Sequence, residues 1–224
     1  LTKGHAMVQP STFVGIGDDA AVIDHRDQLT VVSTDMLVEG IHFDLMYTPL
    51  KHLGYKSVAV NLSDIYAMNA MPTQITLSLA FSNRFSVEAL EEFYEGVYAA
   101  CKNFNVDLIG GDTSSSNKGF IISVTAFGRA TSKNICYRNG AKPGDLVCVS
   151  GNLGSAYLGL QILEREKQIF LSDQTIQPDL ENQAYVVGRQ LKPEPRFDII
   201  ELFEKSGLIP TSMIDISDGL VSEI

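Results

Sequence analysis

Cysteine and histidine are scarce in this chain of 224 residues, which contains three and four of them. The cysteines, Cys101, Cys136 and Cys148, are odd in number, widely spaced and set in apolar runs, so we expect reduced core residues in a cytoplasmic protein. Four scattered histidines disfavour a zinc site. No apolar run approaches the ~20 residues of a transmembrane helix and no signal-peptide pattern is visible, so we expect no membrane partner.

Positive charge is also limited, with 17 Lys and Arg against 27 Asp and Glu and a formal net charge of −10. This balance argues against unaided binding to nucleic acid or to an anionic membrane. The common nucleotide loops are missing too: the P-loop, the protein-kinase glycine loop and the dinucleotide-binding GxGxxG loop. The nearest phosphate-binding candidate is GNLG at 151–154, and a glycine turn that opens a helix is more often structural.

Apolar residues make up 45% of the chain, which is enough for a sizeable core, and the length favours two domains. Periodicity predicts strands at 28–34, 73–81, 106–110 and 120–127, with helices at 53–69 and from the Ser86 cap to about Asn105. The segment 138–145, rich in Gly, Pro and charge, is the expected linker. Beyond it we expect a buried strand at 146–150, helices at 155–167 and from Pro195 to about Ser206, and a strand with a turn at 211–220.

Aspartates flanked by glycine or hydroxyl residues follow one apolar strand after another. They occur at Asp18 and Asp19, at Asp35, at Asp112, and at Asp215 and Asp218, while Asp64 is expected on a helix. A single aspartate beside glycine is more often a turn residue than a ligand. The repeated pattern instead favours a site for a hard cation such as Mg²⁺, which binds carboxylates, hydroxyls, water and phosphate. A Mg²⁺-bound phosphate compound is the implied partner.

Six motifs carry a family resemblance: GIGDDAAVI, STDMLVEGIHF, NLSDIYAMNA, GGDT, YRNGAKPGD and DISDGL. In this order and spacing they resemble the thiamine-monophosphate kinase family, whose superfamily also contains aminoimidazole ribonucleotide synthetase, selenophosphate synthetase and a hydrogenase-maturation ATPase. The resemblance runs from Val14 onward. It implies a two-domain α/β fold: an N-terminal ATP- and Mg-binding domain at 1–139, with a mixed sheet and helices on one side, and an incomplete mixed α/β domain at 140–224. It also implies a homodimer.

The resemblance implies direct Mg²⁺-dependent transfer of the ATP γ-phosphoryl group to thiamine monophosphate, giving thiamine diphosphate and ADP. Several Mg²⁺ ions would be the cofactors, with ATP as co-substrate. The acceptor is a phosphate oxygen that is already ionised near neutral pH, so neither a general base nor a phosphoryl-enzyme is expected. Two alternatives remain open: another ATP-dependent member of the superfamily with a different acceptor, and a non-catalytic Mg-ATP-binding module.

Residues that match the family's motifs take their implied roles from it. The implied metal ligands are Asp18, Ser33, Thr34, Asp35, Asp64, Asp112, Asp215 and Asp218. The implied nucleotide contacts are Tyr94, Gly111, Asp112, Arg138 and Ser217, and the implied substrate contact is His42. Catalytic roles are expected for Asp64, Asp112 and Arg138. The roles of Asp19 and Glu39 stay open, and AMNA, with Asn69, replaces a more usual AMGA.

Overall fold

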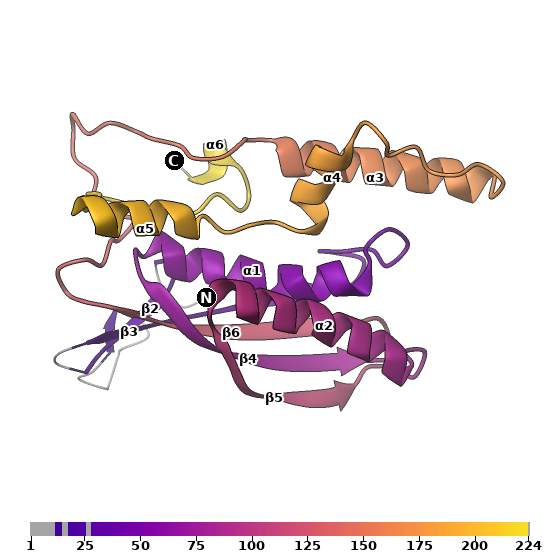
Figure 1. The fold of residues 1–224 in the computed structure, drawn as a ribbon, viewed down its shortest axis with the longest axis horizontal. Helices are drawn as coiled ribbons and strands as arrows, with labels where there is room; N and C mark the ends of the chain where they lie inside the picture. The colour runs from indigo at the N-terminus through magenta and orange to yellow at the C-terminus, as the bar shows by residue number, and fades with distance from the viewer. Residues whose placement is uncertain (1–11, 15–17, 26–27, 224) are drawn as a thin grey trace.

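A six-stranded mixed sheet forms the base of the computed structural model, which describes residues 12–14, 18–25 and 28–223 (Figure 1). The strand order is β1-β2-β3-β6-β4-β5. β4 and β5 run parallel, and the other neighbours are antiparallel. The mixed sheet confirms the predicted fold class. The strands are β1 Thr12–Val14, β2 Ala21–Asp24, β3 Leu29–Val38, β4 Met71–Phe81, β5 Asp107–Ser115 and β6 Ile121–Ala130.

Two long helices, α1 Leu50–Ala67 and α2 Val87–Phe104, cover one face of this sheet (Figure 1). The predicted alternation of β4 explains why, because Ile75, Leu77 and Leu79 are each no more than 3% exposed and belong to the core under the helices. The residues between them, Thr76 and Ser78, point to the opposite face, where Thr76 is half-buried and Ser78 is exposed. The helices on one side and the polar residues on the other agree with the expected N-terminal architecture.

The ends of the two helices follow local signals in the sequence. Ser86 caps α2 as predicted, since its Oγ accepts a hydrogen bond from the N–H of Ala89 at 3.3 Å. Asn105 ends α2 in the left-handed region, with φ of 53°. Asn69, just after α1, has a similar φ of 52°. Asparagine tolerates this conformation better than most residues, so it can replace the more usual glycine of the family motif.

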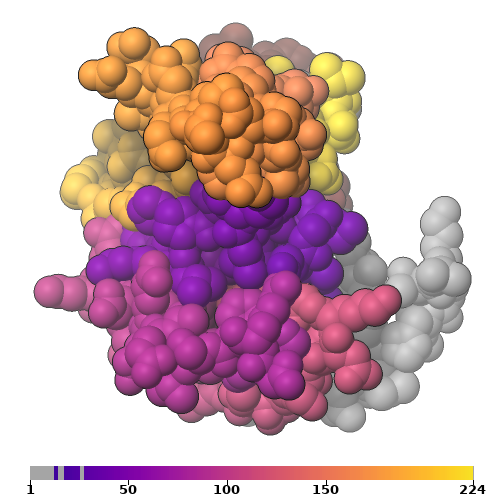
Figure 2. Space-filling view, turned by 90° about the vertical axis from the view of Figure 1, so that its right-hand side faces the viewer, coloured from indigo at the N-terminus to yellow at the C-terminus, as the bar shows by residue number. Residues whose placement is uncertain are grey.

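Four further helices form a second layer over α1: α3 Ser155–Ser172, α4 Ala184–Leu191, α5 Phe197–Ser206 and the short α6 Leu220–Glu223. Figure 2 shows this order from the side, with orange and yellow C-terminal residues above the indigo α1 region. Lys56 Nζ donates to the carbonyl of Gln190 at 3.1 Å, and the Tyr55 hydroxyl donates to Glu194 at 2.7 Å. α1 is therefore enclosed between the sheet and the C-terminal layer.

Several predictions about the C-terminal half are wrong. Residues 146–150 form no strand, and Leu146 and Val147 are 90% and 79% exposed. No neighbouring strand among the described residues pairs with this segment, so its β-type composition has no ladder to join. Cys148 is accordingly exposed, whereas Cys101 and Cys136 are buried and free as expected. Residues 211–216 are also irregular, and helix α4 was not anticipated.

No helix in the described ranges has both the length and the apolar character to cross a membrane.

Backbone contact between α1 and α2 depends on two glycines. A Cβ atom built on Gly54 would lie 2.0 Å from the carbonyl oxygen of Phe93, and one on Gly96 would lie 1.9 Å from that of Lys51. Both distances are far inside van der Waals contact, and both neighbours are backbone atoms that cannot rotate away. The two helices can therefore pack this closely only with glycine at these positions.

We expect Gly96→Ala to lower the free energy of unfolding by about 3 kcal/mol, because α1 and α2 must separate to admit the methyl group. Gly188→Ala is the matched control, since Gly188 lies within α4 and a Cβ there meets no atom within 4 Å. This control should instead stabilise the protein by up to about 1 kcal/mol through helix propensity. Urea unfolding of the variants measures both effects, and equal stability of the two would contradict this packing argument.

Candidate functional site

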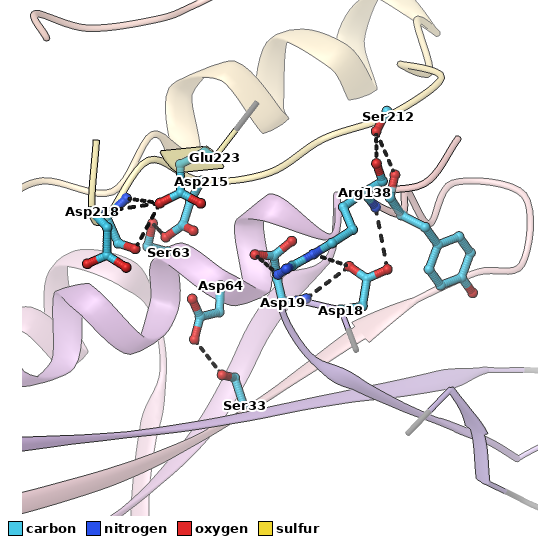
Figure 3. A network of polar contacts seen from close by, with 12 residues as sticks. Asp18, Asp19, Ser33, Ser63, Asp64, Arg138, Ser212, Asp215, Asp218 and Glu223 are labelled. Carbon is cyan, nitrogen blue, oxygen red and sulfur yellow. Dashed lines mark hydrogen bonds and ion pairs between the residues drawn. The ribbon is translucent and has the colours of Figure 1, made fainter. Parts of the chain in front are cut away.

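Five aspartates from four parts of the chain gather where α1 meets β3 and the irregular C-terminal segment. Figure 3 shows four of them, Asp18, Asp19, Asp64 and Asp215. Asp35 lies on β3 and Asp64 on α1. The others lie in irregular segments: Asp18 and Asp19 just before β2, and Asp215 between α5 and α6. The structure thus brings together side chains that are up to about two hundred residues apart in sequence. Of the predicted metal ligands, it joins Asp18, Ser33, Asp35, Asp64 and Asp215.

Contact between β3 and α1 sets the middle of this cluster. Ser33 and Asp35 are two residues apart on β3, so their side chains point to the face that α1 covers. The Ser33 hydroxyl donates a hydrogen bond to Asp64 Oδ2. On α1, the next residue toward the N-terminus, Ser63, donates from its hydroxyl to Asp215 Oδ2 at 2.7 Å. The sheet, α1 and the C-terminal segment therefore meet within a few side chains.

Buried negative charge dominates the electrostatics of the cluster. Burial, with smaller contributions from the charges of Asp35, Asp215 and Asp19, raises the pKa of Asp64 to about 7 against the opposing hydrogen bond from Ser33. Burial likewise raises the pKa of Asp19 to about 6, although Arg138 opposes the shift. The pKa values of Asp35 and Asp215 are also raised, mainly by burial. The carboxylates lack enough positive charge to stabilise their ionised forms together.

Arg138 provides the positive charge at one side of the cluster. Its Nη2 lies 2.7 Å from Asp19 Oδ1, and its Nε lies 3.5 Å from Asp18 Oδ1. The Ser212 hydroxyl donates to the carbonyl of Arg138 at 2.7 Å, which ties this segment to the C-terminal layer. The side chain of Asp19 is only 5% exposed, and its Oδ2 is buried without a hydrogen-bond partner. The single guanidinium therefore leaves part of the cluster unneutralised.

The donor set fits Mg²⁺ bound together with phosphate rather than a closed protein cage. Within the described ranges, no three His, Cys, Asp or Glu residues are arranged to hold one ion by themselves. Mg²⁺ normally binds through one or two carboxylates, with waters and substrate phosphates in its other positions. Spaced carboxylates, the Ser33 hydroxyl and the unpartnered Asp19 oxygen supply ligands of this kind. These groups could supply part of the coordination of a Mg²⁺ ion whose other ligands are waters or a phosphate.

Two predicted ligands lie on the other face of the sheet. Thr34 is exposed there, and it accepts a hydrogen bond from the Thr125 hydroxyl at 3.0 Å. Asp112 lies on β5, where it pairs with Ser78 of β4. Strands β6 and β4 lie between β3 and β5. Three strand spacings amount to about 14 Å, so Asp112 cannot share an ion with Asp35 within one chain. The expectation that these aspartates follow strand ends is wrong, because Asp35 and Asp112 lie inside β3 and β5.

Two of the predicted contacts differ in their surroundings: the substrate contact His42 lies near Asp35, and the nucleotide contact Tyr94 packs on α2. His42 follows β3, and its Nδ1 accepts from the N–H of Val38 at 3.0 Å. It lies close enough for its charge to lower the pKa of Asp35 against the dominant effect of burial. Tyr94 packs on α2 with Phe93 and Tyr98, with ring centroids 5.8 Å apart in both pairs. Its ring contacts are therefore with its own helix.

The final segment contains a carboxylate that sequence reasoning missed. Glu223 Oε1 accepts hydrogen bonds from the N–H groups of Ser217 and Asp218, at 3.3 and 3.1 Å. Its charge also contributes to the raised pKa of Asp215, after the larger effect of burial. Glu223 follows no predicted strand, unlike the aspartates of the motifs, so the strand-and-aspartate pattern did not mark it.

Gly111 lies beside Asp112 on β5, where a Cβ would approach the carbonyl oxygen of Leu77 to 1.8 Å.

Known proteins show the same combination of sequence and fold. The family model for "AIR synthase related protein, N-terminal domain" matches residues 17–130, just over half of the chain. The chain belongs to the AIR synthase related family. Among members and relatives, the thiamine-monophosphate kinase of Bacillus subtilis (strain 168) is 36% identical over 218 residues, and that of Buchnera aphidicola subsp. Schizaphis graminum is 40% identical over 225. These matches cover 96% and 99% of this chain.

Solved structures agree with this placement in the AIR synthase related family. The structure of "AaThiL complexed with AMPPCP and TMP" has a TM-score of 0.82 and 32% identity over 93% of this chain. Hydrogenase maturation protein HypE in complex with ATP, at 21% identity and a TM-score of 0.55, shares the fold alone. The chain spans 62% of the AaThiL chain and 63% and 64% of the two curated kinases.

We expect Arg138→Gln to lower the free energy of unfolding by about 2 kcal/mol in metal-free buffer, because Asp18 and Asp19 lose their cation while staying buried. Arg196→Gln is the control, since it removes an ion pair with Asp198 that is well exposed to solvent. The control should cost about 1 kcal/mol or less. Chemical unfolding in EDTA measures the difference, and equal losses in the two variants would show that Arg138 does not neutralise buried charge.

Removing the charge of Asp64 should stabilise the metal-free protein. Asp64→Asn keeps the shape and the acceptor for Ser33, and it ends repulsion with Asp35, Asp215 and Asp19, so we expect a gain of about 1 kcal/mol in metal-free buffer. Added Mg²⁺ should raise the unfolding temperature of the wild type and have a smaller effect on the variant. Thermal unfolding with EDTA or MgCl₂ tests both points. A variant that is less stable in EDTA would contradict the repulsion argument.

Proposed function

We propose that this protein is a thiamine-monophosphate kinase, which transfers the γ-phosphoryl group of ATP to thiamine monophosphate and yields thiamine diphosphate and ADP. The observation that carries the proposal is the cluster of five aspartates around Asp64, opposed by the guanidinium of Arg138. It occurs in a chain that is 36% and 40% identical to two thiamine-monophosphate kinases. A related solved structure contains AMPPCP and TMP, which supports both substrates.

The reactants explain why such a site needs metal. ATP and thiamine monophosphate are both phosphate anions, and the aspartate cluster would repel them. Bound Mg²⁺ supplies the charge that neutralises the cluster and the transferred phosphoryl group. We propose that the ligands come from the cluster and from the motifs that match the family: Asp18, Ser33, Thr34, Asp35, Asp64, Asp112, Asp215 and Asp218.

Charge and position are the protein's own contributions to the transfer. The acceptor is an ionised phosphate oxygen, so no residue has to remove a proton from it. We propose that Arg138 leaves Asp19 and pairs with a nucleotide phosphate, for which its planar guanidinium is well suited. His42 would contact thiamine monophosphate at the β3 side of the cluster. The proposed nucleotide contacts are Tyr94, Gly111, Asp112, Arg138 and Ser217.

The proposed assembly is a homodimer in the cytoplasm, with an N-terminal domain at 1–139 and a second domain at 140–224. The family match, which ends at residue 130, supports the division. The sheet face opposite α1 and α2 supports the dimer, because it carries exposed residues including Thr34 and Asp112 and no described helix covers it (Figure 1). A second subunit on this face would cover Thr34 and Asp112, which a single chain leaves exposed. The free, buried thiols of Cys101 and Cys136 are compatible with a reducing compartment.

The decisive experiment uses the full-length protein with ATP, Mg²⁺ and thiamine monophosphate, and it follows thiamine diphosphate by chromatography. Product should require all three components. Asp64→Asn should reduce turnover at least about 100-fold while the protein stays folded, because a ligand for the neutralising metal is lost. Asp173→Asn changes an aspartate that bonds locally to Thr175, and it should leave turnover unchanged.

Three outcomes would count against the proposal. ATP binding without thiamine diphosphate would remove the acceptor assignment and favour another ATP-dependent superfamily member or a non-catalytic Mg-ATP-binding module. Near-normal turnover by Asp64→Asn would remove Asp64 from the reaction. A phosphoryl group trapped on any Asp or Ser would refute direct transfer.

A further inference from the structure

One turn of α1 makes three separate connections into the aspartate cluster. Asn61 Oδ1 accepts a hydrogen bond from the backbone N–H of Asp35 at 2.9 Å. Ser63 donates to Asp215 at 2.7 Å, and Asp64 accepts from Ser33. Asp64 is a proposed ligand itself, whereas Asn61 and Ser63 contact the segments that carry other ligands. Their position suggests a role in arranging the site.

The Asn61 side chain bonds to β3 beyond the end of that strand's pairing with β2. The pairing of β2 with β3 ends at Ala21 and Val32, so the N–H of Asp35 has no partner from β2. The Asn61 side chain takes that place, and its Nδ2 donates to the carbonyl of Ser57 at 2.8 Å. This second bond fixes the amide with its oxygen toward β3. Asn61 is 1% exposed, so it is held in one orientation by its surroundings.

Ser63 holds Asp215, which lies in a segment without regular structure. Asp215 lies between α5 and α6, where no helix or strand of its own fixes its backbone. The hydroxyl of Ser63 is a direct side-chain link between Asp215 and the rigid helix (Figure 3). Hydrogen bonds to a charged acceptor are stronger than those between neutral groups, so this bond can hold the carboxylate against its acidic neighbours.

We propose that Asn61 and Ser63 are positioning residues that fix Asp35 and Asp215 relative to Asp64 before a cation binds. Without these bonds, repulsion would drive the carboxylates apart, and the cation would have to gather them at a cost in affinity. Partners that orient metal ligands commonly contribute 10- to 100-fold to metal affinity. The inference rests on the cation binding required by the proposed function, and it is independent of the phosphate acceptor.

Ser57 provides a matched control on the same helix face. It is as buried as Asn61, at 1% exposure, and its hydroxyl donates to the carbonyl of Gly54 at 2.8 Å within α1. Ser57→Ala removes a buried hydrogen bond, as Asn61→Ala does, and costs about 1 kcal/mol of stability. Its hydroxyl bond stays within α1 and reaches neither β3 nor the segment of Asp215. A purely structural role for Asn61 would make the two variants behave alike toward metal.

The test measures Mn²⁺ binding by electron paramagnetic resonance of the free ion, with Mn²⁺ as a probe for the oxygen ligands that bind Mg²⁺. Asn61→Ala and Ser63→Ala should each weaken Mn²⁺ binding by about 10-fold or more. Ser57→Ala should bind like the wild type. Ser63→Thr keeps the hydroxyl and should restore most of the affinity that Ser63→Ala loses.

The Mn²⁺ measurements test the positioning role, and product formation tests the kinase assignment separately. Wild-type affinity in both alanine variants would overturn the positioning role, and so would an equal loss in Ser57→Ala. If Asn61→Ala fails to fold, the more exposed Ser63 carries the test through its alanine and threonine variants. Weakened Mn²⁺ binding in the two variants, combined with no thiamine diphosphate from the wild type, would support the positioning role and reject the kinase assignment.

Discussion

Repulsion among closely spaced, partly buried aspartates at one end of α1 is the constraint on which the other features of the site depend. Five carboxylates share a small region, and burial raises the pKa of Asp64 to about 7. A fold driven only by stability would not collect them. Arg138, the hydroxyls of Ser33 and Ser63, and the amide of Asn61 each reduce the cost of this arrangement in a different way. The remaining deficit of positive charge is what makes the site receptive to a metal bound to phosphate.

The position of α1 makes this arrangement possible. The helix is enclosed by the sheet below and by the C-terminal layer above, so side chains from both layers reach it (Figure 2). Its buried residues include the polar Ser57 and Asn61 as well as a large apolar set. Polar side chains buried in this way must be hydrogen-bonded, and here their partners are the helix itself and β3. The helix is therefore both part of the core and the support of the site.

Much of the N-terminal fold could be predicted from the sequence, because its strands and helices have strong local periodicity and a clear cap at Ser86. The family motifs also identified Asp18, Asp35, Asp64 and Asp215, which the fold brings together. The C-terminal errors have a physical origin: 146–150 has the composition of a buried strand, but burial requires a partner that no local pattern reveals. The contributions of Asn61, Ser63 and Glu223 depend on tertiary contacts, so they could not be read from spacing alone.

The glycine contacts between α1 and α2 also affect how the molecule can move. Because the backbones of the two helices touch at Gly54 and Gly96, neither helix can slide or rotate against the other without a steric clash. Because Asp64, Asn61 and Ser63 lie on the same helix as Gly54, we expect them to keep their positions relative to α2. Any adjustment to an incoming nucleotide must arise in the irregular segments that carry Asp18, Arg138 and Asp215. The site consequently has a fixed wall on α1 and an adaptable wall formed by these three segments.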